Sequence, residues 1–104
     1  MDVTVNKRGA VLEVAMAGEL DQHSAAELRS RLDEELRDRR IVRIEYDLRG
    51  LSFMDSSGIG VLLGRYRTLA ARKGTMDIRN ARRNVEMILR MSGVYSLCTE
   101  RSRQ

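Results

Sequence analysis

Segments with the two-residue repeat of a β-strand alternate along this chain with segments that have the periodicity of an α-helix. Residues 3–6 and 11–17 alternate apolar and polar side chains, and the turn between them predicts a β-hairpin. Residues 41–48 and 75–79 are the next expected strands, and a helical pattern follows each of the last three strands. This order predicts an α/β fold with a mixed, mostly parallel sheet, an N-terminal antiparallel strand and flanking helices.

Local signals set the expected ends of the first two helices. Ser24, with Glu27 three residues later, predicts a capping box at the start of the first helix, which is expected to end near Arg39. The preceding residues 18–23 are mostly polar and are expected to form a loop. The second helix is expected to end near Gly74.

The C-terminal part contains one clear stop signal. Gly93 is expected to end the third helix, because glycine readily adopts the left-handed conformation found after many helices. Residues 94–99 are expected to form a last strand or an extended tail. Within it, Cys98 is expected to act as a small apolar residue, since a single cysteine cannot form an internal disulfide.

Size and composition limit the kind of protein. A chain of 104 residues fits one compact domain, so we expect residues 1–104 to form a single domain. Hydrophobic residues make up 42% and charged residues 33%, a mix that is typical of globular rather than disordered chains. No apolar run is long enough to cross a bilayer, and the N-terminus lacks the pattern of a signal peptide. We therefore expect a cytoplasmic protein.

The charge of the chain is basic but not concentrated. The net charge is +4, yet the arginines are spread over the whole sequence with Asp and Glu among them. Only residues 37–43 approach a basic run, and aromatic residues are scarce, which argues against a platform for stacking bases. We expect no direct contact with nucleic acid and none with a membrane, while an acidic protein partner stays open.

Residues 51–60, LSFMDSSGIG, follow a predicted parallel strand, which is where α/β proteins place their sites. Asp55 is a good N-cap, because its carboxylate can accept from the free N–H groups of a first helical turn. Ser56 would lie in that turn, where the partial positive charge of a helix N-terminus tolerates an attached phosphate. A phosphate adds a charge of about −1.5 to −2. The pattern fits a reversible docking switch, and it also fits an ordinary capped helix.

Three glycines lie near the start of the same predicted helix. Gly58, Gly60 and Gly64 occur there although glycine costs a helix about 1 kcal/mol relative to alanine. They indicate that the backbone approaches something closely, either the neighbouring sheet or a partner protein. Their spacing matches neither the GxGxxG dinucleotide fingerprint nor a P-loop.

The sequence does not favour a catalytic or metal site. The GxSxG motif is absent, and His23, the single histidine, would have to lie beside Ser56 to complete a Ser-His-Asp triad. One histidine and one cysteine, far apart in the sequence, do not make a zinc site. We expect no enzymatic activity, no metal and no cofactor.

Residues 51–66, LSFMDSSGIGVLLGRY, closely resemble the switch segment of bacterial anti-anti-sigma factors (anti-sigma-factor antagonists) of the STAS-domain family, and above all its sporulation branch. The sequence GELD at residues 18–21 resembles the loop after the family's second strand, and residues 24–28 resemble the start of its first helix. MSGV at residues 91–94 resembles the end of its last core helix region. The likeness runs along nearly the whole chain.

The resemblance implies a regulatory protein built as one STAS-like domain. In this family the serine directly after the Asp, here Ser56, is phosphorylated by an anti-sigma factor serine kinase that has ATP or ADP bound. The unphosphorylated antagonist binds the kinase and releases the sigma factor, and a PP2C-type phosphatase resets the phosphorylated form. The free protein is expected to be a monomer.

The resemblance also implies a docking surface around the phosphorylated serine. The residues expected to contact the partner are Asp21, His23, Ser52, Asp55, Ser57 and Gly58. Gln22 departs from the family pattern, in which a histidine often occupies that position. The alternative is a STAS switch in another circuit, such as the general stress sigma-B pathway or a stressosome-like scaffold.

Overall fold

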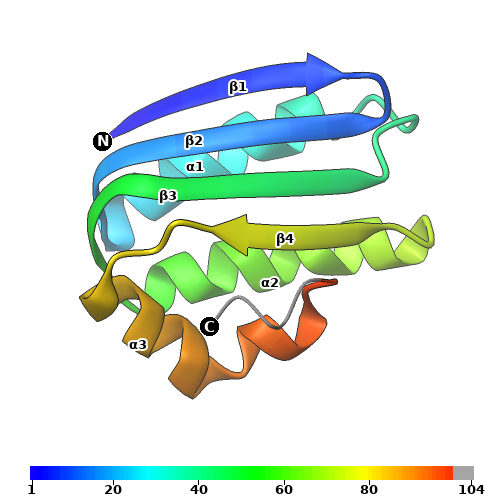
Figure 1. Ribbon diagram of the computed structural model, residues 1–104. Coiled ribbons are helices and arrows are strands. Elements are labelled where there is room, and N and C mark those ends of the chain that lie inside the picture. The colour runs from blue at the N-terminus through cyan, green and yellow to red at the C-terminus, as the bar shows by residue number, and fades with distance from the viewer. Residues whose placement is uncertain (100–104) are drawn as a thin grey trace.

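Four strands form one mixed sheet in the order β1-β2-β3-β4 in the computed structural model, which describes residues 1–99. The β1 strand is antiparallel to β2, whereas β2, β3 and β4 are parallel. The predicted α/β fold, with an antiparallel strand at the N-terminal edge of a mostly parallel sheet, is confirmed (Figure 1). The strands are β1 (Asp2–Arg8), β2 (Val11–Leu20), β3 (Arg43–Met54) and β4 (Thr75–Arg79).

The helices are α1 (Gln22–Glu35), α2 (Ser56–Ala71) and α3 (Arg83–Ser92), and a short 3₁₀-helix, η1 (Val94–Leu97), follows α3. Figure 1 shows α1 and α2 running along the sheet, while α3 follows the C-terminal end of β4. No helix within residues 1–99 is long and apolar enough to span a membrane. A single domain over residues 1–104 stays a prediction.

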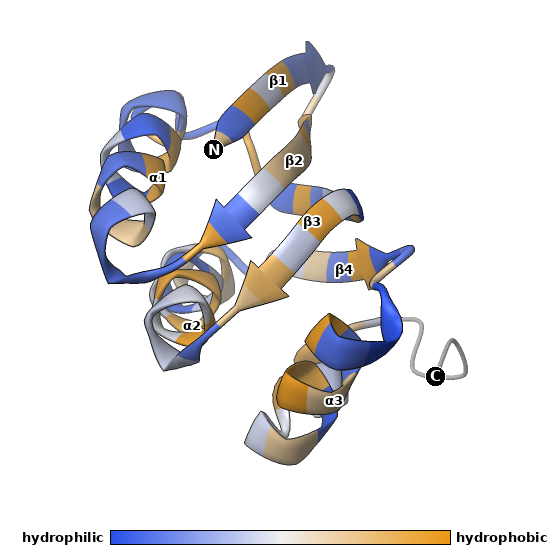
Figure 2. Cartoon of the chain, turned by 90° about the vertical axis from the view of Figure 1, so that its left-hand side faces the viewer, coloured by the Kyte–Doolittle hydropathy of each residue, from blue (hydrophilic) through white to orange (hydrophobic). Residues whose placement is uncertain are grey.

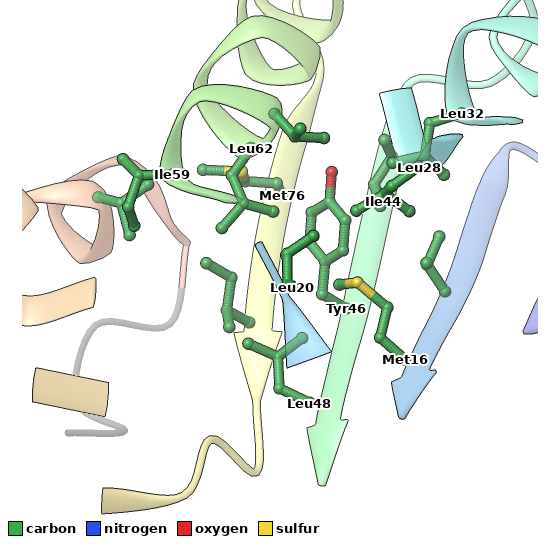
Figure 3. Packing of buried hydrophobic residues seen from close by; sticks show 14 of the residues in the cluster. Met16, Leu20, Leu28, Leu32, Ile44, Tyr46, Leu48, Ile59, Leu62 and Met76 are labelled. Atoms are coloured by element: carbon green, nitrogen blue, oxygen red, sulfur yellow. The ribbon is translucent and has the colours of Figure 1, made fainter. Parts of the chain in front are cut away.

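The core lies between the sheet and the two long helices (Figure 3). Buried residues of β3 on the covered face alternate with partly exposed ones over residues 43–48, and Tyr46 projects from the centre of β3 toward the helices. Burying a large apolar side chain stabilises a fold by about 1.5–3 kcal/mol, so this face supplies most of the driving force. The labelled members of this cluster are Met16, Leu20, Leu28, Leu32, Ile44, Tyr46, Leu48, Ile59, Leu62 and Met76.

Strands β2 and β3 are longer than the sequence predicts. The expected polar loop over residues 18–23 is wrong at both ends, because β2 continues to Leu20 and α1 begins at Gln22. The strand expected to end at Leu48 continues to Met54. The pairing of the two strands has two register shifts, each with one extra residue in β3. Gly50 allows their close approach, since an added Cβ there would lie 2.8 Å from the Cβ of Ala17.

The start of α1 also differs from the prediction. Its N-cap is Asp21, not Ser24, and the capping box joins Asp21 to Ser24 rather than Ser24 to Glu27. The Ser24 backbone N–H donates to Asp21 Oδ1 at 3.0 Å, and the Asp21 backbone N–H donates to Ser24 Oγ at 2.9 Å. Serine at the third helical position therefore does what glutamate does in the usual pattern.

The end of α1 comes earlier than the expected position near Arg39, because the chain leaves the helix after Glu35. Arg72, at the end of α2, stabilises the connection that follows. Its guanidinium donates to the carbonyl oxygen of Leu36 at 2.6 Å and to that of Ile41 at 2.9 Å. These bonds satisfy carbonyl groups that a longer helix would have paired internally.

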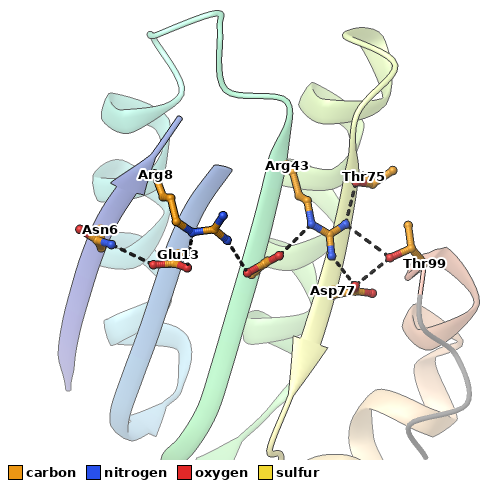
Figure 4. A network of polar contacts seen from close by, with 8 residues as sticks. Asn6, Arg8, Glu13, Arg43, Thr75, Asp77 and Thr99 are labelled. Atoms are coloured by element: carbon orange, nitrogen blue, oxygen red, sulfur yellow. Dashed lines mark hydrogen bonds and ion pairs between the residues drawn. The ribbon is translucent and has the colours of Figure 1, made fainter. Parts of the chain in front are cut away.

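The C-terminal part turns back onto the sheet edge. Gly93 has φ +80° and ends α3, as predicted, but the expected strand or extended tail over residues 94–99 is wrong because η1 forms there. Cys98 follows η1 and is buried, and burial raises the pKa of its thiol to about 11. The Thr99 hydroxyl donates to the buried Asp77 carboxylate, which also pairs with Arg43 (Figure 4).

Candidate functional site

The ends of β2 and β3 lie side by side and each leads directly into a helix. Leu20 is paired with Met54, the last residues of the two strands. The next residues, Asp21 and Asp55, are the N-caps of α1 and α2. The Asp55 backbone N–H donates to the Leu20 carbonyl oxygen at 3.2 Å, which fixes the two helix starts next to each other. Figure 2 shows this edge of the sheet facing the viewer.

The start of α2 presents a serine hydroxyl at the surface. Asp55 Oδ1 accepts from the Ser57 backbone N–H at 2.8 Å, as expected of an N-cap, and the Gly58 N–H donates to the Asp55 carbonyl oxygen at 3.0 Å. Ser56 is the first residue of the helix and is exposed, while Ser57 is partly buried. The hydroxyl of Ser56 is therefore open to a second protein, at the positive end of the helix dipole.

Asp21 forms the second polar point of this edge. Its carboxylate accepts hydrogen bonds from the backbone N–H and the hydroxyl of Ser24, which hold the Asp21 pKa below its usual value. His23 and Gln22 are exposed in the first turn of α1. A shallow depression between the two helix starts is lined by Asp21, Gln22, His23, Ala26 and Asp55. The surface beside Ser56 is therefore polar and carries carboxylates.

Ser52 joins three elements at the same edge. Its hydroxyl donates to the Gly18 carbonyl oxygen in β2 at 3.0 Å, and its own carbonyl oxygen accepts from Asn84 Nδ2 in α3 at 2.8 Å. Arg82 adds a bond from Nε to the Arg49 carbonyl oxygen at 3.0 Å. Asn84 and Arg82 are not predicted as part of this edge, because no local sequence pattern links these positions to the end of β3.

The three glycines of α2 have different surroundings. Gly58 is buried, and a Cβ there would lie 2.8 Å from both Leu20 Cδ2 and Met54 Cγ. Gly60 and Gly64 would have nothing within 4 Å of an added Cβ. The sheet therefore requires the glycine at position 58, which packs inside the structure rather than lying on the expected docking surface.

The polar groups of this edge come from the starts of α1 and α2. In the described part of the chain, no hydrogen bond links His23 to Asp55 or Ser56, and no cluster of three or more metal-ligating side chains is found within residues 1–99. What the geometry offers is one exposed hydroxyl at a helix start, with two ordered carboxylates nearby.

A family model for the STAS domain matches residues 2–102 of this chain. The chain belongs to the STAS domain family. This STAS domain is 35% identical over 97 residues to a protein of Paenibacillus polymyxa named anti-sigma F factor antagonist, covering 93% of this chain and 83% of the relative. It is 29% identical to a Bacillus subtilis protein named anti-sigma-B factor antagonist, over 93% of this chain and 87% of that protein.

Solved STAS domains have the same fold. The unphosphorylated form of the anti-sigma factor antagonist SpoIIAA superposes with a TM-score of 0.83 at 28% identity, covering 94% of this chain and 86% of that one. The phosphorylated form of the Bacillus cell fate determinant SpoIIAA gives a TM-score of 0.74 at 27% identity, with 94% and 89% covered. The family assignment and the mixed sheet flanked by helices therefore agree with the sequence prediction.

Proposed function

We propose that this protein is an anti-sigma-factor antagonist whose binding to an anti-sigma factor serine kinase is controlled by phosphorylation of Ser56. The observation that carries this proposal is the exposed hydroxyl of Ser56, directly after the capping Asp55. Support comes from relatives named as antagonists of anti-sigma factors and from a related protein solved in phosphorylated form.

The switch follows from the charge that phosphorylation adds. The kinase transfers the γ-phosphoryl group of its bound ATP to Ser56 Oγ, the hydroxyl proton is lost, and ADP leaves. The helix N-terminus tolerates the new charge of about −1.5 to −2, so the fold is kept. The phosphate and the carboxylates of Asp21 and Asp55 then give this edge an excess of negative charge, which disfavours a partner fitted to the neutral serine.

The remaining partners follow from the same proposal. The unphosphorylated protein binds the kinase and releases the sigma factor, and a PP2C-type phosphatase hydrolyses the phosphoserine to reset the cycle. The protein acts as a binding module without enzymatic activity of its own, in the cytoplasm, and is a monomer when free. Asp21, His23, Ser52 and Ser57 contribute to the docking surface around Ser56, all of them on the surface or partly exposed.

A second candidate is the same switch in a general stress circuit. The similarity to the anti-sigma-B factor antagonist of Bacillus subtilis favours it, since that similarity covers 93% of this chain. The chemistry at Ser56 is unchanged in this alternative, and only the identity of the kinase differs.

Peptide mass spectrometry after incubation with kinase and ATP tests the proposal. We expect one added phosphoryl group on Ser56 in the wild type and in Ser57→Ala, and none in Ser56→Ala. Parallel reactions with the anti-sigma F and anti-sigma-B kinases of the same organism separate the two circuits. Modification of Ser57 instead of Ser56, or none with kinases that modify their own substrates, would overturn the assignment.

A further inference from the structure

Three large apolar side chains of β3 and α3 are exposed. Phe53, at the end of β3, has 42% of its surface exposed, and Met87 and Met91 of α3 have 56% and 80% exposed. Met16, Met54 and Met76 are buried in the core, whereas this pair on α3 is not. Clustered apolar residues on a protein surface commonly mark a site of contact with a partner.

Hydrogen bonds place this part of α3 against the end of β3. Asn84 Nδ2 donates to the carbonyl oxygen of Ser52, the residue before Phe53, at 2.8 Å. Asn84, Met87 and Met91 are spaced i, i+3 and i+7, so they lie along one side of α3. The apolar stripe formed by Met87 and Met91 therefore starts beside the end of β3. Phe53 lies at that end, three residues before Ser56. Figure 2 shows α3 and the end of β3 on the same side of the molecule as the start of α2.

The methionines do not belong to the core contact of α3. That contact is made by Val85 and Leu89, which are fully buried. A helix that only packs against a sheet needs a single apolar side and exposes polar residues elsewhere. Flexible, polarizable methionine side chains adapt well to a partner surface, so a second protein is the natural cover for this stripe.

The surroundings of the stripe are positively charged. Arg49 of β3, Arg82 at the N-cap of α3, and Arg83 and Arg90 within α3 are all exposed. Glu86 is the one acidic residue of α3, and it pairs with Arg90 at 3.2 Å. A partner that covers the methionines must also meet this positive rim, and oppositely charged groups at an interface rim steer association and select the partner.

We propose that Phe53, Met87 and Met91 form an apolar extension of the docking surface, which binds an apolar pocket bordered by carboxylates on the anti-sigma kinase. This inference rests on the proposed function and adds a second contact with the same partner. Because these side chains lie outside α2, they supply affinity separately from the serine that is modified, and the kinase can hold its substrate through α3 while Ser56 reacts.

Binding and kinetics of α3 variants test this contact. The probe is the ADP-loaded anti-sigma F kinase of the organism that carries this chain, or its anti-sigma-B kinase if that one modifies Ser56. We expect Met87→Gln combined with Met91→Gln to weaken binding about tenfold or more, as loss of interface anchors does. With ATP, KM should rise while kcat for Ser56 phosphorylation stays unchanged, because the reacting groups are intact. Ala71→Gln, at the other end of α2, is the matched control.

Charge variants at one position test whether carboxylates border the pocket on the kinase. Met91→Lys and Met91→Glu both replace the apolar end of the side chain with a charge, and the two charges have opposite signs. We expect the lysine variant to bind more tightly than the glutamate variant, with a difference that shrinks as salt is added. Equal binding by these two variants would contradict the proposal that carboxylates border the kinase pocket.

The two proposals fail in different ways. Wild-type binding strength in the double glutamine variant, with wild-type phosphorylation, would overturn the α3 contact and leave the Ser56 switch intact. Wild-type protein that neither kinase binds or modifies would overturn both. Thermal unfolding of each variant checks that the fold is kept, as expected for side chains that are more than half exposed.

Discussion

The backbone N–H of Asp55 donates to the carbonyl oxygen of Leu20 over 3.2 Å, and this bond joins the start of α2 to the end of β2. The residue after Leu20 is Asp21, the cap of α1, so one backbone bond fixes both helix starts. Ser56 follows Asp55 directly. The position of the exposed hydroxyl is therefore set by the sheet rather than by a flexible loop.

Loss of the α2 cap should destabilise the protein measurably. Asp55→Ala removes the acceptor of the Ser57 N–H, and we expect the free energy of unfolding to fall by about 1 kcal/mol. Asp55→Asn keeps an oxygen acceptor and should retain most of the stability. Urea unfolding followed by circular dichroism measures both variants, and equal losses would show that charge, not the cap bond, stabilises the helix start.

The Asp21 cap should make stability depend on pH. Hydrogen bonds from Ser24 lower the pKa of Asp21 below the reference value of 3.8, so the folded state favours the carboxylate. The contribution of the Asp21 carboxylate to the free energy of unfolding is fully present above that reference value. It is lost as pH falls through the lower pKa of the folded state. Asp21→Asn cannot titrate. Urea unfolding between pH 7 and 2.5 should therefore show a stability difference between wild type and variant that is constant at high pH and changes below pH 3.8.

Two glycines two residues apart on α2 should respond oppositely to alanine. Gly58→Ala places a Cβ 2.8 Å from Leu20 and Met54 side-chain atoms, and such overpacking costs about 1–3 kcal/mol. Gly60→Ala enters open space and should stabilise the helix by about 0.5–1 kcal/mol. Thermal unfolding of the two variants compares them directly. A stable Gly58→Ala protein would mean that Leu20 and Met54 can move apart without cost.

The parts of the fold that the sequence predicted are those with strong local signals. Two-residue alternation located β1 and β2, and Gly93 marked the end of α3 because its positive φ favours glycine. Asp55 was recognised as the cap of α2 from the Asp-Ser-Ser sequence alone. These features depend on neighbours along the chain, so a single sequence contains enough information to find them.

The features that escaped prediction depend on contacts between distant residues. Strand β3 extends to Met54 because it pairs with β2, and Gly50 can approach Ala17 only in that pairing. The bond from Asn84 to Ser52 spans 32 positions of the chain. The exposure of Met87 likewise depends on how α3 sits on the sheet, since an amphipathic pattern alone does not say which methionines are covered.

Variants of Ser56 test the switch through binding alone. Ser56→Ala keeps the neutral surface and cannot accept a phosphoryl group, so it should bind the kinase as wild type does and stay bound when ATP is added.

Ser56→Asp adds one negative charge beside Asp55 at an exposed helix start, and we expect binding to weaken about tenfold or more. Ala71→Asp, which adds the same charge at the exposed far end of α2, is the matched control and should bind as wild type does. Isothermal titration calorimetry at two salt concentrations measures the effect, which should shrink at high salt because the repulsion is screened. Wild-type affinity in Ser56→Asp, together with release of phosphorylated wild type, would mean that the size and shape of the phosphate, rather than its charge, separate the two proteins.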